Sequence, residues 1–136
     1  MITGYNHVSL TVGDLERSIE FYGKAFGLKL RQRFESIGSK VSGYKDTHAK
    51  VAFLTMGLLS LELIQYLNPK GEHRPVLETK DVGTPHLAFV TDNMEEDYQR
   101  LLKMGVRFKS TPQRSPRFGS LSVYGLDPDG ITFEMQ

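Results

Sequence analysis

The sequence contains no cysteine, and this absence removes several classes of site at once. Disulfide bonds, thiolate metal sites and cysteine nucleophiles are all excluded. A chain of 136 residues must therefore be stabilised by its core, which is large enough at this length to need no covalent cross-links. The absence also agrees with a reducing compartment, and we expect a cytoplasmic protein.

An excess of charge and a long apolar segment are also missing. With 17 basic residues, 16 acidic residues and a net charge of +1, the chain has no electrostatic preference for nucleic acid or for a membrane surface. No apolar run approaches the roughly 20 residues that span a bilayer, and residues 1–7 have neither the basic nor the apolar region of a secretory signal. We expect a soluble protein that binds neither nucleic acid nor membrane.

One order of predicted elements occurs twice along the chain. Each half begins with a strand, continues with an amphipathic helix and ends with three strands. The first set is predicted at 5–12, 15–26, 28–34, 50–55 and 59–66. The second is predicted at 86–91, 93–104, 106–108, 120–124 and 131–136, with 110–119 as a loop. The prediction is an α+β protein of two βαβββ modules, at about 1–67 and 83–136, joined by a linker at about 68–82.

A histidine and a glutamate stand at equivalent places in the two halves. His7 and His86 are 79 positions apart, and Glu62 and Glu134 are 72 positions apart. A single strand histidine is more often structural and a strand glutamate usually faces solvent. Acids that only face solvent, however, have no reason to recur at the same place in both modules. Two imidazoles and two carboxylates suit a divalent cation such as Ni, Zn, Co, Mn or Fe.

Other candidate residues have no such repetition. His48 and His73 lack counterparts in the other module, and we interpret both as surface residues. Arg114 and Arg117 flank a proline-containing loop and could hold an anionic group of a substrate, although solvated basic loops are more common. Three further residues could line a cavity, and the sequence does not rank them: Phe53, Tyr124 and Gln136.

Two stretches resemble the vicinal oxygen chelate superfamily, which includes glyoxalases, bleomycin-resistance proteins and extradiol dioxygenases. HVSLTVGDLERSIEFY at 7–22 is similar to its opening strand and helix, and LDPDGITFE at 126–134 is similar to its closing turn and strand. The resemblance covers nearly the whole chain. It implies that the paired modules form an eight-stranded, partly closed barrel around a metal site, and that the protein is a homodimer.

The resemblance also implies a site and a reaction. His7, Glu62, His86 and Glu134 match the metal ligands of bacterial-type glyoxalase I, and this full set favours a lyase or isomerase of glyoxalase I or epimerase type. Such an enzyme would act on a small molecule with vicinal oxygens. It would transfer a proton next to a carbonyl through a metal-bound enediolate, with Glu134 or Glu62 as the base.

Two alternatives remain open from the sequence. One is an Fe(II) ring-cleaving dioxygenase that uses His7, His86 and Glu134, and the other is a small-molecule binding or antibiotic-resistance protein without catalysis. No motif marks a glutathione site. The residues distinguish neither the substrate nor the native metal, nor whether the site lies within one chain or is shared across a dimer.

Overall fold

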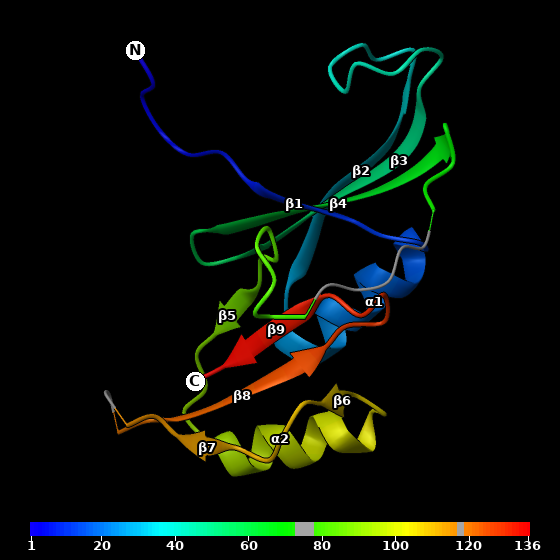
Figure 1. Ribbon diagram of the computed structural model, residues 1–136. Coiled ribbons are helices and arrows are strands. Elements are labelled where there is room, and N and C mark those ends of the chain that lie inside the picture. Colours follow the sequence, from blue (N-terminus) through cyan, green and yellow to red (C-terminus); the bar gives the residue numbers. More distant parts are fainter. Residues whose placement is uncertain (73–77, 117–118) are drawn as a thin grey trace. The chain divides into compact units, whose positions relative to one another are not determined.

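A computed structural model describes residues 1–72, 78–116 and 119–136 of the chain (Figure 1). The fold divides into two compact units, Met1–Arg74 and Pro75–Gln136. Each unit contains one helix and one mixed sheet, which confirms the α+β class and the paired βαβββ order. The joining of the two sheets into one barrel remains a prediction. No helix in the described part of the chain is both long and apolar enough to cross a bilayer.

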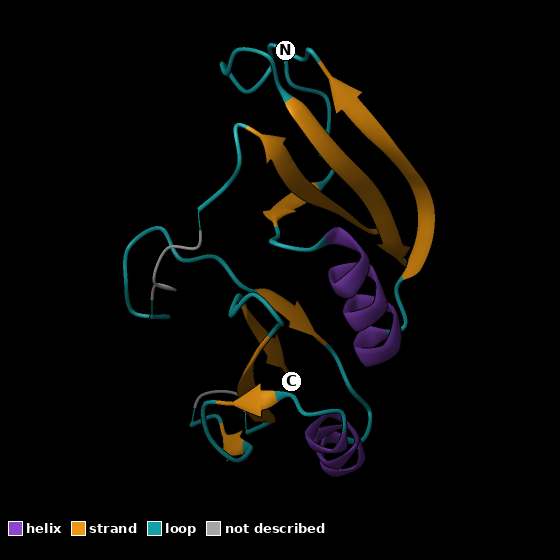
Figure 2. Cartoon of the chain, turned by 90° about the vertical axis from the view of Figure 1, so that its right-hand side faces the viewer, coloured by secondary structure: helices purple, strands orange, loops and turns teal. Residues whose placement is uncertain are grey.

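The first unit is a four-stranded sheet with a helix against one face (Figure 2). Its strands run in the order β1-β4-β3-β2, in which β1 is parallel to β4 and the other neighbours are antiparallel. The elements are β1 (Val8–Thr11), α1 (Leu15–Phe26), β2 (Lys29–Ile37), β3 (His48–Met56) and β4 (Leu59–Asn68).

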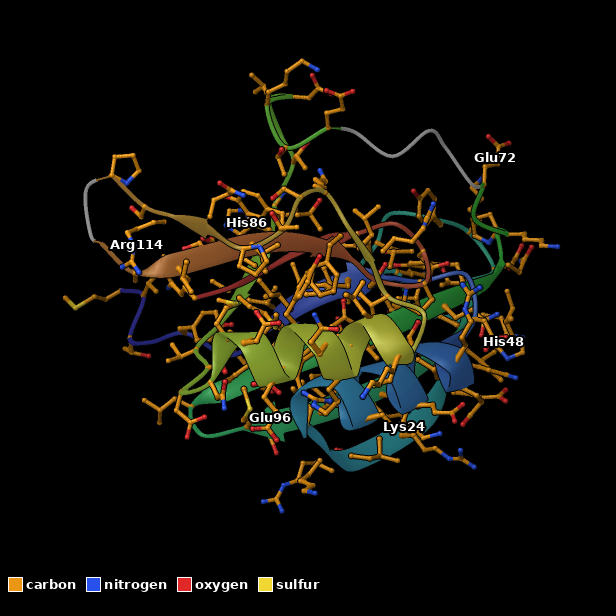
Figure 3. All side chains as sticks on the ribbon, turned by 90° about the horizontal axis from the view of Figure 1, so that it is seen from below. Lys24, His48, Glu72, His86, Glu96 and Arg114 are labelled. Carbon is orange, nitrogen blue, oxygen red and sulfur yellow. The ribbon has the colours of Figure 1, made fainter. Side chains whose placement is uncertain are left out.

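Helix α1 begins and ends where its local sequence predicts. The side chain of Asp14 accepts a hydrogen bond from the backbone N–H of Arg17 at 3.1 Å, which caps the first turn. Gly27 ends the helix in the left-handed conformation at φ 75°. The helix buries Leu15, Tyr22 and Ala25, and its charged side, which includes Lys24, projects outward (Figure 3). The core beneath is built from fully buried leucines: Leu54, Leu61 and Leu63.

The second unit repeats this plan with shorter strands. Its sheet has the order β5-β9-β8-β6, and β7 also pairs with β8. Strand β5 is parallel to β9, as β1 is to β4. The elements are β5 (Leu87–Phe89), α2 (Met94–Lys103), β6 (Arg107–Phe108), β7 (Gln113–Arg114), β8 (Leu121–Leu126) and β9 (Thr132–Met135).

Strand β7 corrects one prediction, because it lies inside the loop predicted at 110–119. Both β6 and β7 pair with β8, so together they stand where β2 pairs with β3 in the first unit. The interruption between them contains Pro112, which has no N–H to donate to a ladder. The described residues therefore form nine strands, the eight that were predicted and β7.

The repeat extends to individual backbone hydrogen bonds. In the parallel pairs Ser9 lies opposite Glu62, and Ala88 lies opposite Glu134, which preserves both sequence offsets. The N–H of Val12 donates to the carbonyl of Ile64 at 2.9 Å, and the N–H of Thr91 donates to that of Gln136 at the same distance. Equivalent residues of the two units can therefore be compared position by position.

Candidate metal-binding site

The first candidate pair lies on the sheet face that α1 does not cover. Glu62 is in β4 between Leu61 and Leu63, whose side chains are buried on the helix side. His7 immediately precedes β1, and its Nε2 lies 3.5 Å from Oε2 of Glu62. The two side chains are 33% and 19% exposed, so the pair is reachable from solvent.

The second pair repeats this arrangement in the other unit. His86 immediately precedes β5, and its Nε2 lies 3.2 Å from Oε2 of Glu134 in β9. The side chains are 37% and 18% exposed, and Figure 3 labels His86 beside the strands of this sheet. Both histidines were predicted within strands, but pairing in each case starts one residue later, at Val8 and Leu87.

An aromatic ring packs against each histidine. The ring of Phe53 meets His7 nearly perpendicularly, with centroids 5.4 Å apart at 84°. Tyr124 meets His86 in the same way, at 5.3 Å and 80°. Both aromatic residues lie opposite the glutamate of their pair, Phe53 opposite Glu62 and Tyr124 opposite Glu134. Burial and the charge of Glu134 raise the pKa of Tyr124.

The other ring nitrogen of His7, Nδ1, also has a partner. Nδ1 lies 2.7 Å from Oδ1 of Asn6, so an Nδ1–H donor would leave the Nε2 lone pair directed at the Glu62 side. A hydrogen bond from the second ring nitrogen is the usual way in which proteins orient a metal-binding histidine. The equivalent position before His86 is Pro85, whose side chain offers no acceptor.

The spacing within each pair fits two ligands of one ion. Ligands about 2.1 Å from an ion and about 90 to 110° apart lie roughly 3.0 to 3.4 Å from each other. The observed separation of 3.2 Å in the second pair lies within this range, and that of 3.5 Å in the first pair lies just above it. Across residues 1–72, 78–116 and 119–136 no group of three or more histidine, aspartate or glutamate side chains is suited to a metal. The structure thus brings the four predicted ligands together as two pairs, and their union in one site remains a prediction.

The remaining candidates have separate surroundings. His48 begins β3, where its Nε2 lies 2.7 Å from Oε2 of Glu35, and this hydrogen bond lowers the pKa of that carboxyl group. The Arg114 side chain donates to the backbone carbonyl of Gly119. Gln136 is exposed at the end of β9. His73 and Arg117 lie outside the described residues.

Comparison with known proteins gives consistent matches over almost the entire chain. The sequence model of the Glyoxalase/Bleomycin resistance protein/Dioxygenase superfamily matches residues 4–135. Lactoylglutathione lyase of Escherichia coli O157:H7 is 30% identical over 133 residues, which cover 95% of this chain and 88% of that protein. Lactoylglutathione lyase GLX1 of Arabidopsis thaliana is 30% identical over 131 residues, but this chain spans only 42% of its length.

A solved structure shows the same fold. The crystal structure of a glyoxalase family protein from Bacillus cereus superimposes with a TM-score of 0.86. The match covers 99% of this chain and 93% of that one, at 22% sequence identity. At this identity the likeness concerns the fold alone.

Proposed function

This chain belongs to the Glyoxalase/Bleomycin resistance protein/Dioxygenase superfamily, and from that premise we propose that it is a divalent-metal-dependent lyase or isomerase. The proposed reaction is proton transfer next to a carbonyl group in a small molecule that has two neighbouring oxygens. The observation that carries the proposal is the repetition of the histidine–glutamate pair, in which each Nε2 faces an Oε2 at 3.5 and 3.2 Å.

The four paired side chains are the proposed ligands of one ion. His7 and His86 would each contribute Nε2, and Glu62 and Glu134 would each contribute a carboxylate oxygen. This set of nitrogen and oxygen donors fits Ni, Zn, Co, Mn or Fe. When bound, such an ion supplies Lewis acidity that stabilises negative charge on a substrate oxygen.

A carboxylate of the same set is the proposed base. Glu62 and Glu134 occupy equivalent positions, and either could remove a proton from the carbon next to the carbonyl and return it. The two differ in their neighbours, since Tyr124 places a hydroxyl group in the second unit where Phe53 has none. The proposal therefore assigns the proton transfer to one of the two glutamates, and comparison of the two variants decides which.

The activity is tested by proton exchange. In heavy water, the protein supplied with each candidate metal should exchange the proton next to the carbonyl of a 2-oxo or 2-hydroxy acyl compound, observed by NMR. Glu134→Gln and Glu62→Gln should each reduce exchange by about 100-fold or more, since both hold the ion and one is the base. A Glu95→Gln variant, changed on the exposed side of α2, is the matched control. Undiminished exchange in both site variants would overturn the proposal.

The proposal also includes the assembly and the compartment. We propose a homodimer, as the family resemblance implies, in a reducing cytoplasm, as the absence of cysteine suggests. Light scattering coupled to size-exclusion chromatography gives the assembly directly, and a mass equal to one chain would contradict the dimer.

A further inference from the structure

The sheet face that holds His7 and Glu62 continues into a row of apolar side chains. In β3, Phe53 lies opposite Glu62, and Val51 lies opposite Ile64 of β4. In β2, Phe34 lies opposite Val51. Paired residues of an antiparallel sheet project to one side, and so do residues two apart in one strand. The row therefore shares its face with Glu62, and its members are Phe34, Val51, Phe53 and Ile64, of which Val51 is buried and the other three are at least partly exposed.

Ring contacts connect this row to the histidine. The rings of Phe34 and Phe53 are stacked, with centroids 6.5 Å apart and 19° between their planes. Phe53 in turn meets the ring of His7 at 5.4 Å. Phe34 is 42% exposed. A single exposed phenylalanine needs no explanation, but this one ends a continuous aromatic path that starts at a proposed ligand.

The equivalent row of the second unit is polar. Tyr124 lies opposite Glu134, and Gln113 lies opposite Ser122, as Phe53 lies opposite Glu62 and Phe34 lies opposite Val51. Gln136 corresponds to Ile64 through the matching hydrogen bonds that their carbonyls accept. Four apolar positions of the first unit are thus occupied in the second by Gln113, Ser122, Tyr124 and Gln136.

The two units therefore repeat the proposed ligands but not the surface beside them. Symmetry in the ligands follows if they hold one ion, whereas the surface beside them is free to follow the shape and polarity of the substrate. The four side chains of the row offer no donor to an anionic group, and the amide of Gln32, opposite Phe53 in β2, brings no charge to balance one, so such a group would lose hydration there with little compensation. The carboxylate of Glu62 would also repel it.

We propose that the substrate carries a neutral apolar substituent, aromatic or branched alkyl, next to its two neighbouring oxygens, and that Phe34 and Phe53 bind this substituent. The inference rests on the proposed function, because it assumes that the oxygens bind an ion held by the four ligands. Aromatic stacking and the burial of a phenyl group in place of a methyl group would strengthen binding by about 10- to 100-fold.

Three hydroxamates test this inference because they present the same two neighbouring oxygens to a metal. Acetohydroxamate carries a methyl group, benzohydroxamate a phenyl group and succinate monohydroxamate an anionic chain. Their dissociation constants are measured with the cobalt-loaded full chain by calorimetry and by the visible spectrum of the ion. We expect benzohydroxamate to bind about 10- to 100-fold more tightly than acetohydroxamate, and the anionic probe to gain nothing.

Substitutions at equivalent positions of the two units then separate the contribution of the apolar row to binding from the contribution of the ion. Phe34→Gln places in the first unit the residue type found at the equivalent position, Gln113, and should lower the phenyl-to-methyl affinity ratio about 10-fold. Phe34→Leu should restore part of that ratio, and Gln113→Ala in the second unit should leave it unchanged. Comparing this ratio between the variant and the natural sequence removes the intrinsic difference in chelating strength between the probes, because that difference is the same in both proteins.

The outcomes distinguish this inference from the proposed function. If all three hydroxamates bind but Phe34→Gln leaves the phenyl-to-methyl ratio unchanged, the apolar row does not bind the substituent and the inference is wrong. If none of the three perturbs the cobalt spectrum or binds, the proposed metal site itself fails and the inference falls with it.

Discussion

Asn6 differs from the other residues near the site because it acts through a ligand rather than on the ion. Its Oδ1 lies 2.7 Å from Nδ1 of His7 and can hold the ring with Nε2 available to a metal. We predict that Asn6→Ala lowers metal affinity by about 10-fold, measured by competition with a chromophoric chelator. The fold should be unaffected because Asn6 is exposed. Equal affinities for the variant and the natural sequence would contradict this role.

Gly125 shows how the repeated core accommodates unequal residues. A methyl group added at Gly125 would overlap the ring of Phe133, which lies opposite it in the β8–β9 pair. In the first unit the equivalent pair is two leucines, Leu54 and Leu61. Where the first unit packs two leucines, the second unit therefore packs one large ring against a glycine.

Overpacking at this position should destabilise the second unit. We predict that Gly125→Ala lowers the free energy of unfolding by about 1 to 3 kcal/mol, measured by urea denaturation. Adding Phe133→Leu, which removes part of the ring that the new methyl group meets, should recover some of the loss. Unchanged stability of Gly125→Ala would show that the ring can move aside.

The sequence alone predicts some features of the candidate site, whereas other features can be identified only in the structure. The two histidine–glutamate pairs were predicted because a duplicated pattern is visible in the chain itself. Phe53 and Tyr124 were named as residues that could line a cavity, but their contacts with the histidines were not predicted, because those contacts depend on which residues of neighbouring strands lie opposite one another. The register is fixed by the pairs that flank each hairpin turn, Met56 with Leu59 and Leu126 with Thr132, and these set each aromatic residue opposite a glutamate.

At the scale of elements, the helices were predicted to within about one residue at each end. Helix α1 spans Leu15–Phe26 as predicted, and α2 begins at Met94 after the cap Asn93. Capping residues and apolar stripes are local signals, so they can be read without the fold. Strand β7 was missed because two residues carry no periodic pattern, and only pairing with β8 makes them a strand.

The start of α2 carries a pH-dependent contact. The hydroxyl of Thr91 donates to Oδ2 of Asp97 at 2.6 Å, and Arg100 lies 2.7 Å from Oδ1 of the same carboxyl group. These contacts lower the pKa of Asp97, with the Thr91 hydrogen bond as the largest cause. A lowered pKa in the folded state means that the stabilisation is present above about pH 4, the ordinary value, and is lost as the pH falls through the folded-state pKa.

Removal of the hydroxyl should therefore cost more at neutral pH than in acid. We predict that Thr91→Val lowers the free energy of unfolding by about 1 to 2 kcal/mol at pH 7. The difference from the natural sequence should shrink at about pH 3, where the carboxylate is increasingly protonated. Urea denaturation at the two pH values measures both quantities, and an equal loss at each would mean that the Thr91 hydroxyl does not favour the charged form of Asp97.

At the scale of the whole molecule, two units with the same topology each present one histidine and one glutamate at matching distances. The family match over residues 4–135 accounts for the fold. Sequence patterns could predict the duplication, because each unit forms from residues close along the chain. They could not predict the apolar face of one unit and the polar face of the other, which arise from pairing across strands.

The central proposal is that the two pairs hold one ion together rather than one ion each. Metal content distinguishes these arrangements because a shared ion depends on both pairs at once. Glu62→Gln and Glu134→Gln each replace a carboxylate with a neutral amide of about the same size, the first in one unit and the second in the other.

The most direct measurement is elemental analysis of the purified protein after saturation with a divalent metal and removal of excess ion. We predict about one ion per chain for the natural sequence, and a large loss of that ion in both Glu134→Gln and Glu62→Gln, since four ligands bind it. Two ions per chain, or normal loading of either variant, would contradict the shared site.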